Sequence, residues 1–363
     1  MNNLVLHLKR LDWPIVICTV SLMGIGLLSL YSSSIEGADF LNFQKQCIFA
    51  GIGLLLMFLS SSIDWRLFRN DPYLVFILYL LSCLALAGLF LFAPETRGVR
   101  GWYKVGPVSL DPIEFTKLTL IILLAKYFSI YHVEVYRIKH VLLSGFYILI
   151  PSVLIFLHPD LGSVLVIISL WLAILIISGI KIRAFLMIIL CLLLVLASGW
   201  SFMLQDYQKQ RIISFLLPQF EPLGIGWSET QSKIAIGSGG ILGQGFGQGS
   251  QTQYGFLSEP QTDFIFAAIA EEFGLVGVSV IFVLFSLLIW RIVKITLTSQ
   301  TNFPRIFATG LAILLALQIF INIGMNLGLL PIIGIALPLI SYGGSGLILT
   351  CIGLGIIQSI KTH

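Results

Sequence analysis

Long runs of apolar residues fill most of this chain and constrain its fold more than any other feature. Each run has about 20 residues, the length that a helix needs to cross the hydrocarbon core of a membrane. Of the 363 residues, 57% are hydrophobic and 10% are charged, whereas a soluble domain has about 25% charged residues. We therefore predict an all-α polytopic membrane protein and exclude a soluble globular fold.

The apolar runs divide the chain into about ten transmembrane helices, which form one domain over residues 1–363. The predicted spans are residues 13–34, 45–62, 72–92, 114–131, 140–157, 163–180, 183–202, 264–292, 304–327 and 342–360. With this division, most basic residues fall on connections at one side of the membrane, which is typical of the cytoplasmic side. Both termini are then cytoplasmic, and residues 203–262 form a large extracytoplasmic loop between helices seven and eight.

Several common site types are not supported by the sequence. The five cysteines lie in apolar runs without C-x-x-C spacing, which favours a packing role. The histidines form no metal-ligand spacing. The glycine-rich segment 237–255 lacks the G-x-x-x-x-G-K-[ST] pattern of a nucleotide-binding loop. It could fold over a substrate or serve as a connection, and the sequence leaves both interpretations open.

An acidic residue, Asp263, stands where the large loop meets the eighth predicted span, and Glu271 and Glu272 follow inside that span. A carboxylate at or below a membrane surface is costly, so it is a functional candidate by default. The structural alternative for Asp263 is a helix N-cap. Helical geometry places Glu271 about 12 Å deeper than Asp263. Contact with a basic partner is the structural alternative for both glutamates.

The first outer loop breaks the positive-inside trend, because it carries Arg97, Arg100 and Lys104 around Trp102. Basic side chains near the outer interface suit a phosphate or pyrophosphate headgroup. The tryptophan could stack on a sugar or anchor in the interface. Contact between the basic side chains and ordinary lipid headgroups is the alternative.

Three further features have both structural and functional interpretations. Glu114 and Lys117 are one helical turn apart and suit a local ion pair. Asp160 lies between a proline and a glycine and suits a turn. A segment broken by Pro and Gly, residues 328–345, includes Ser341. Broken backbone at membrane depth is tolerated where it is buried or lines a cavity. Together these residues suit an enzyme on a lipid-linked phosphate, and equally a transporter.

Four motifs resemble those of the SEDS family (RodA, FtsW, SpoVE) and occur in that family's order along the whole chain. They are GVRGWYKVGPVSLDPIEFTKL, HPDLGS, GFLSEPQTDFIFAAIAEEFGLVG and GLLPIIGIALPLISYGGSGLI. The form of HPDLGS, of GIALPLISYGG and of the terminal SIKTH is most similar to RodA. One departure is Gln261, where the family usually has a histidine, so no role is assigned to a histidine beside Asp263.

The resemblance implies a peptidoglycan glycosyltransferase of the bacterial cytoplasmic (inner) membrane that polymerises lipid II during cell elongation and cell-shape maintenance. It implies that Asp263, in the T-D-F motif, is the family's essential aspartate. The family's sensitive tryptophan corresponds to Trp102, its E-x-x-K to Glu114 and Lys117, and its P-D-x-G aspartate to Asp160. The full set of expected substrate-binding residues is Arg97, Arg100, Trp102, Lys104, Glu114, Lys117, Asp160, Glu259 and Ser341.

The expected reaction is an inverting transfer on the extracytoplasmic side. Asp263 would take the proton of the acceptor hydroxyl, while Arg100, Lys104 and Lys117 would neutralise the departing undecaprenyl pyrophosphate. A divalent cation, Mg²⁺ or Mn²⁺, is a candidate to share that work, although no ligand set is readable; no other cofactor is expected.

The expected partners are a class B penicillin-binding protein transpeptidase, other elongation-complex membrane proteins and membrane lipids, with no nucleic acid. A lipid II flippase and a non-catalytic scaffold for a transpeptidase are the alternative functions.

Overall fold

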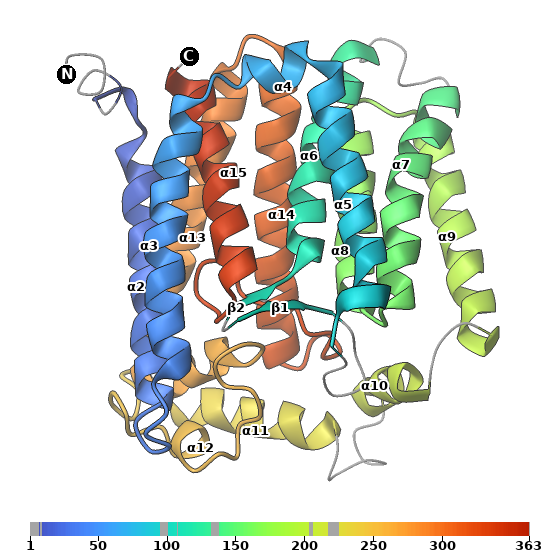
Figure 1. Cartoon of the computed structure of the whole chain (residues 1–363). Helices are drawn as coiled ribbons and strands as arrows, with labels where there is room; N and C mark the ends of the chain where they lie inside the picture. Colours follow the sequence, from blue (N-terminus) through green and yellow to red (C-terminus); the bar gives the residue numbers. More distant parts are fainter. Residues whose placement is uncertain are drawn as a thin grey trace.

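The protein is a bundle of long helices that run roughly side by side (Figure 1). The computed structural model describes residues 7, 9–94, 101–106, 108–131, 138–202, 206–216 and 225–362. The long helices are α2 (Trp13–Ser33), α3 (Leu41–Ser62), α5 (Pro72–Phe92), α6 (Pro112–Tyr131), α7 (Ile138–Leu157), α8 (Leu161–Ile177), α9 (Ile182–Phe202), α13 (Ile265–Thr298), α14 (Asn302–Asn326) and α15 (Gly344–Thr362). Helix α4 (Arg66–Asn70) is a short connection between α3 and α5.

The predicted all-α polytopic architecture is confirmed. Within the described ranges, eight helices are long and apolar enough to cross a membrane. The other two predicted spans are also helices of the bundle. Helix α8 has 17 residues, and α6 carries Glu114, Lys117 and Lys126 within its 20 residues. Helix α6 can hold Lys117 because it packs against α5 and α14, which bury most of its surface.

The eighth predicted span contains a break that the sequence analysis did not predict. Gly274 has φ 62° and ψ −160°, so α13 consists of a short outer segment and a long spanning segment. The glycine-rich loop pairs with this break: the N–H of Gln244 donates to the Glu271 carbonyl (2.9 Å), and the N–H of Leu275 donates to the Gly240 carbonyl (2.9 Å). These bonds satisfy backbone groups that a membrane would otherwise leave unpaired.

The first outer loop contains a small hairpin, which is a local exception to the all-helical prediction. Strands β1 (Tyr103–Val105) and β2 (Val108–Leu110) pair antiparallel. Gly106, with φ 62°, lies at the turn, where a positive φ favours glycine. The Tyr103 hydroxyl donates to the Ala85 carbonyl of α5 at 2.6 Å and holds the hairpin against the bundle.

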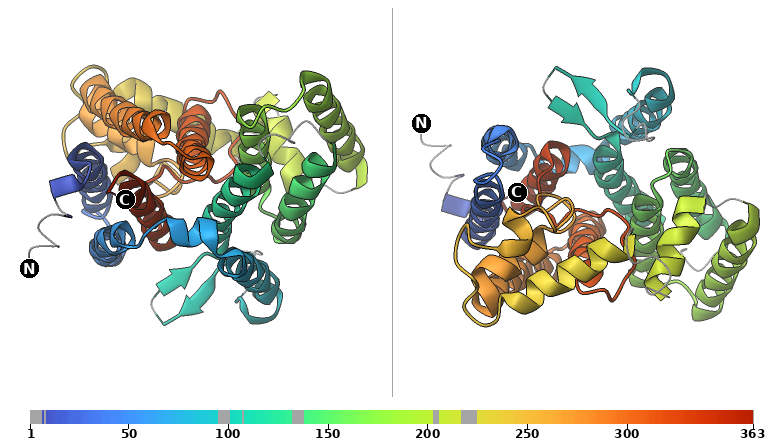
Figure 2. Two further views of the ribbon diagram at one scale, coloured as in Figure 1. Left: turned by 90° about the horizontal axis from the view of Figure 1, so that it is seen from above. Right: turned by 90° about the horizontal axis from the view of Figure 1, so that it is seen from below.

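The large loop folds across one end of the bundle (Figures 1 and 2). Its described helices are α10 (Asp206–Leu216), α11 (Ile225–Ser238) and α12 (Ser250–Gln253). Helix α11 packs against α13 and α14. A second, smaller hydrophobic cluster joins the loop to the start of α13, and its buried members are Ala235, Leu257, Phe264, Ala267 and Ala268.

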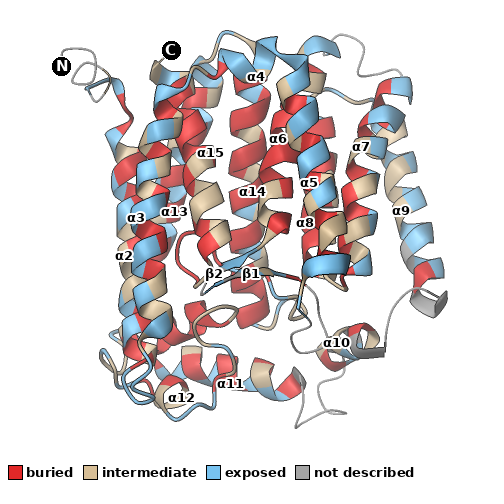
Figure 3. Ribbon diagram, viewed as in Figure 1, coloured by how far each residue is buried: buried red, intermediate tan, exposed pale blue. Residues whose placement is uncertain are grey.

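Burial is concentrated inside the bundle, whereas the outer helix faces are exposed and apolar (Figure 3). Among the candidate spans, α14 is the most enclosed and α9 the least. Leu186, Leu190 and Leu194 of α9 are each more than half exposed. An apolar outer surface around a helical bundle is suited to lipid acyl chains, since helices satisfy their own backbone hydrogen bonds.

A buried ion cluster ties three helices together at the end remote from the large loop. The Asp12 carboxylate, 1% exposed, accepts hydrogen bonds from Arg291 Nε of α13 at 3.0 Å and from Lys361 Nζ of α15 at 2.8 Å. Helix α2 therefore begins, and α15 ends, at the same end of the bundle.

Candidate active site

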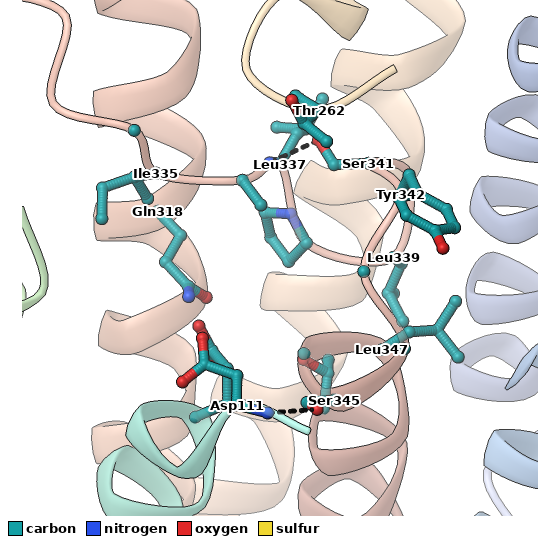
Figure 4. Close-up of a pocket in the computed structure, with 18 of the residues that line it drawn as sticks. Asp111, Thr262, Gln318, Ile335, Leu337, Leu339, Ser341, Tyr342, Ser345 and Leu347 are labelled. Atoms are coloured by element: carbon teal, nitrogen blue, oxygen red, sulfur yellow. Dashed lines mark hydrogen bonds between the residues drawn. The ribbon is translucent and has the colours of Figure 1, made fainter. Parts of the chain in front are cut away.

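A cavity of about 380 Å³ lies where the broken segment between α14 and α15 meets the start of α6. Figure 4 shows Asp111 and Ser345 at one end of this cavity, and Thr262 and Ser341 at the other. The sequence analysis left the Pro- and Gly-broken segment either buried or lining a cavity, and the structure shows that it lines one. The polar and charged lining residues are Ser109, Asp111, Glu114, Lys117, Asp160, Ser163, Thr262, Gln318, Ser341, Ser345 and Thr350, and Trp102 adds an indole.

Asp263 lies at the rim of this cavity, held by its backbone. Asn322 and Asn326 of α14 donate side-chain hydrogen bonds to the Asp263 carbonyl at 3.1 and 2.9 Å. A Cβ atom added to Gly334, a lining residue, would lie 3.8 Å from Asp263 Oδ2. The side chain does not cap α13, which begins two residues later without a side-chain cap bond. The N-cap interpretation of Asp263 is therefore wrong.

The pKa of the Asp263 carboxyl is raised to about 6. Burial is the largest cause, and the negative charges of Glu259 and Asp160 raise the pKa further, while Arg211 lowers it. Glu259 itself is exposed and has a left-handed backbone, with φ 46°. A carboxylate with a pKa just below neutrality is ionised at pH 7 and still basic enough to accept a proton efficiently.

The Ser341 hydroxyl makes two hydrogen bonds to the backbone around the site. It donates to the Thr262 carbonyl at 2.7 Å and accepts from the Leu337 N–H at 2.9 Å. It thereby joins the broken segment to the residue before Asp263. Ser341 also lines the cavity, so a structural contact and a position beside substrate coincide in one side chain.

Glu114 and Lys117 form the local ion pair that their spacing predicts, with 2.7 Å between Lys117 Nζ and Glu114 Oε1. The Lys117 side chain is 2% exposed, and that of Glu114 is 21% exposed. Both also line the cavity. The ion pair holds a cation in a buried place, where an unpaired ammonium would be costly.

Asp160 likewise combines a structural contact with a place in the cavity wall. Its Oδ1 accepts from the Ser163 N–H at 2.9 Å and caps α8, a local backbone contact that replaces the expected role in a turn. The residue also lines the cavity.

Asp111 is a cavity residue that the sequence analysis missed. Its Oδ1 accepts from the Ile113 N–H at 2.8 Å, and its own N–H donates to Ser345 Oγ at 2.8 Å. Burial, followed by the charge of Glu114, raises the pKa of Asp111 to about 7. An acidic residue directly before a proline and three residues before Glu114 was the available signal. Gln318 of α14 was also missed, because nothing in the sequence links α14 to this cavity.

The basic residues of the first outer loop are only partly placed. Trp102 lines the cavity and is 42% exposed. Lys104 lies on β1 opposite Ser109, is exposed, and is absent from the cavity lining. Arg97 and Arg100 lie outside the described residues. Lys117 is therefore the cation that the described part of the chain brings into this cavity.

A second cavity, of about 350 Å³, adjoins the first, since Asp111 and Ser345 line both. Its other walls are largely apolar and come from α5, the hairpin, α6 and α15: Ala85, Tyr103, Leu110, Pro112, Phe115, Ile348 and Leu349. A polar cavity and an apolar one thus share a boundary at the start of α6.

Glu271 and Glu272 lie away from this cavity, and the expectation of a basic partner is wrong among the residues described. Glu271 accepts from the N–H groups of Gln251 and Thr252 at 2.7 and 3.1 Å, and from the Thr252 hydroxyl at 2.7 Å. Glu272 accepts from the Ser32 hydroxyl. Because α13 breaks at Gly274, both belong to its short outer segment, so they are not deep in the spanning helix.

No group of three His, Cys, Asp or Glu side chains suited to a metal ion occurs in the described ranges. The carboxylates of Asp111, Glu114 and Asp160 each accept a hydrogen bond from a neighbouring group instead. A ligand set for a divalent cation is therefore not evident among the described residues, and we derive no catalytic step through one.

Comparison with known proteins decides the family. The family model described as cell cycle protein, of the FtsW, RodA and SpoVE type, matches residues 13–363. The chain belongs to this family. Among curated proteins, it is similar to the peptidoglycan glycosyltransferase MrdB of Escherichia coli (strain K12), with 35% identity over 355 residues, 98% of this chain and 94% of the relative.

Two solved structures share the fold of this SEDS-family chain. One, from work on the structural coordination of polymerization and crosslinking by a peptidoglycan synthase complex, has a TM-score of 0.82 and 30% identity and covers 97% of both chains. The rod shape determining protein RodA of Thermus thermophilus has a TM-score of 0.71 and 29% identity, covering 97% of this chain and 96% of its own. The resemblance read from the four motifs is therefore confirmed.

Proposed function

We propose that this SEDS-family chain is the peptidoglycan glycosyltransferase that polymerises lipid II into glycan strands for cell elongation and cell shape. The glycosyltransferase activity follows from the family and its curated relatives. The mechanism is supported mainly by Asp263, whose carboxyl has a pKa of about 6 and lies at the rim of a charged cavity. In this proposal the cavity is extracytoplasmic and both termini are cytoplasmic.

Asp263 is the general base of the proposed reaction. The sugar 4-hydroxyl of the acceptor lipid II attacks the anomeric carbon of the lipid-linked donor strand, and Asp263 accepts the hydroxyl proton. The bond from that carbon to the phosphate oxygen breaks, and undecaprenyl pyrophosphate leaves. Because the donor is an α-phosphate and the product is β-linked, one displacement with one base is sufficient, in partial analogy to inverting glycosidases.

In this proposal Lys117 neutralises the pyrophosphate, and Arg97, Arg100 and Lys104 are further candidates for the same role. The Lys117 ammonium is already oriented by Glu114, so little reorganisation is needed when negative charge develops on the leaving group. Trp102 stacks on a sugar of the substrate, since it is half-exposed at the cavity wall. The earlier expectation of Mg²⁺ or Mn²⁺ is testable by chelation with EDTA during the assay.

The part of the polyprenyl tail next to the pyrophosphate enters the apolar cavity that shares Asp111 and Ser345 with the polar one. A lipid-linked pyrophosphate has a charged head directly joined to an apolar chain, and the two adjoining cavities have the same order. Asp160, Glu259 and Ser341 shape the head-group side of this site, the first and last from the cavity wall.

A membrane transpeptidase of the class B penicillin-binding type is the proposed partner, with other elongation-complex membrane proteins around it. The similarity to a protein of a synthase complex that couples polymerization to crosslinking supports this assignment. A glycan strand needs a separate crosslinking activity, and nothing in the cavity suggests a second catalytic centre.

The flippase alternative loses the feature that favoured it. It required carboxylates near mid-membrane, and Glu271 instead holds the glycine-rich loop at the outer segment of α13. The scaffold alternative gives no role to the raised pKa of Asp263 or to the buried Glu114–Lys117 ion pair in the cavity wall. We therefore retain the enzyme alone.

The test is lipid II polymerisation by purified protein in detergent, with glycan products resolved on a gel. Wild type and Asp263→Asn are compared with and without the cognate transpeptidase. Glycan ladders from wild type and none from a folded variant are expected. Equal ladders from both would remove Asp263 from catalysis, and no product from wild type with its partner would overturn the enzyme assignment.

A further inference from the structure

A further cavity, with both polar and apolar walls, lies at the end of the bundle opposite the candidate active site. Its volume is about 520 Å³, and residues of α6, α8, α13 and α14 surround it. Helices α6 and α8 begin at the active-site cavity and end here, whereas α14 begins here and ends beside Asp263. The lining residues are Phe128, Ile177, Ser178, Thr296, Leu297, Asn302, Arg305, Ile306 and Thr309.

The charge in the described lining of this cavity is positive. Among the described residues, Arg305 is the charged residue of its lining, and no carboxylate belongs to that lining. The Arg305 side chain is exposed, and its Nε donates to the Ser299 carbonyl at 2.8 Å. That bond orients the guanidinium while leaving its two terminal nitrogens as donors. An oriented guanidinium is well suited to the oxygens of a phosphate.

Ser178, which follows the last residue of α8, also lines the cavity. Its Oγ has no hydrogen-bond partner among the residues described. In addition, α14 begins at Asn302, and its N-cap Thr301 makes no side-chain cap bond. The first N–H groups of this 25-residue helix are thus further donors toward an anion.

The remaining wall is apolar and reaches the lipid-facing surface. Phe128, Ile177, Leu297 and Ile306 line it, and Ile177 and Leu297 are 50% and 75% exposed. A free phosphate has no use for such a wall, whereas a phospholipid joins a phosphate to acyl chains. Lys181, in the connection between α8 and α9, Arg183 at the start of α9 and Lys294 near the end of α13 also lie toward this end of the bundle. Such basic side chains favour anionic headgroups at the membrane surface.

We propose that this cavity binds the phosphodiester headgroup of an anionic phospholipid, with Arg305 as the main contact. The bound lipid joins α6, α8, α13 and α14 at the end remote from Asp263, and so stabilises the helices that carry the active site. This site is independent of the proposed transferase chemistry, because none of its residues lines the active-site cavity.

The test is native mass spectrometry of the delipidated full-length protein with added phosphatidylglycerol. Arg305→Gln is compared with Arg69→Gln, which removes an exposed arginine of α4 outside the cavity. Wild type and Arg69→Gln should retain one phosphatidylglycerol equally. Arg305→Gln should bind it roughly tenfold more weakly, the effect of losing one charge-assisted bond. An equal loss in both variants would mean diffuse surface attraction and would overturn the site.

A second variant and two other probes complete the test. Asn302→Trp retains the charge but fills the cavity, and it should weaken phosphatidylglycerol binding if the cavity is the site, even where Arg305→Gln does not fold. Phosphatidylcholine should bind less than phosphatidylglycerol; equal binding would overturn the anionic assignment. Inorganic phosphate should leave the melting temperature unchanged where phosphatidylglycerol raises it. An equal rise with both would replace the lipid by a free phosphate.

Discussion

Asp263 and Glu271 are carboxylates at the same outer end of α13, and their surroundings are opposite. Glu271 is fully buried and accepts hydrogen bonds from two backbone N–H groups and from a threonine hydroxyl. For the Asp263 carboxylate, the described residues provide no hydrogen-bond donor. Burial raises the pKa of the Asp263 carboxyl, and the negative charges of Glu259 and Asp160 raise it further.

The difference shows how one short segment separates structure from chemistry. A carboxylate whose oxygens are satisfied holds parts of the chain together, as Glu271 holds the glycine-rich loop against the break at Gly274. A buried carboxylate without donors is a stronger proton acceptor, and it lowers stability when ionised. Sequence position alone made Glu271 and Asp263 similar candidates.

The largest expected effect is that of Asp263→Asn. Loss of the general base should lower the polymerisation rate by a factor on the order of 10²–10⁴. The melting temperature should stay equal or rise, because a folded-state pKa near 6 means that ionised Asp263 destabilises the fold above that pH. Thermal unfolding and gel assays on the same preparation check both. A lower melting temperature with unchanged rate would reverse the comparison.

Glu271→Gln should show the opposite pattern. The amide places an NH₂ group against donors that need an acceptor, so the free energy of unfolding should fall by about 1–3 kcal/mol. Activity per folded molecule should be retained. Thermal unfolding in detergent measures the first and polymerisation the second, with the exposed Glu36→Gln as a matched control. Lost activity at full stability would make Glu271 a functional residue.

Gly243→Ala tests the loop that Glu271 holds. Gly243 has φ 82°, and an added Cβ would lie 2.0 Å from the Glu272 carbonyl oxygen. The backbone must move, so we expect a loss of about 1–3 kcal/mol in stability. Gly237→Ala is the control, because a Cβ there meets nothing within 4 Å. Equal melting temperatures for the two variants would show that the loop is not fixed against α13.

The smallest expected effect is a shift of the pH profile. In wild type, kcat/KM should rise with pH through about 6, as Asp263 loses its proton. Glu259→Gln removes a negative charge that raises this pKa, so the acid limb should move to lower pH by less than one unit. Each profile is normalised to its own plateau. An unmoved limb would mean that Glu259 does not act on the Asp263 carboxyl.

Local patterns predicted the local features well. The Glu114–Lys117 pair follows from helical spacing, and Asp160 makes a local backbone contact, although as a helix cap and not in the expected turn. The hairpin and the break at Gly274 were missed, because both depend on contacts with distant residues. Asp111 was missed for the same reason, since its burial beside Ser345 joins α6 to α15.

By itself, the sequence determined a polytopic helical membrane protein of the SEDS family, because helix length, hydrophobicity and linear motifs are properties of neighbouring residues. The tertiary structure alone decided which charges share a cavity. Lys117 entered it and Lys104 stayed on the exposed hairpin. Asp263 lies close to Gly334 of the cavity lining, whereas Glu271 binds the segment that follows the glycine-rich loop. Burial and hydrogen-bond partners set the chemistry of a charge, and both arise from segments far apart in the chain.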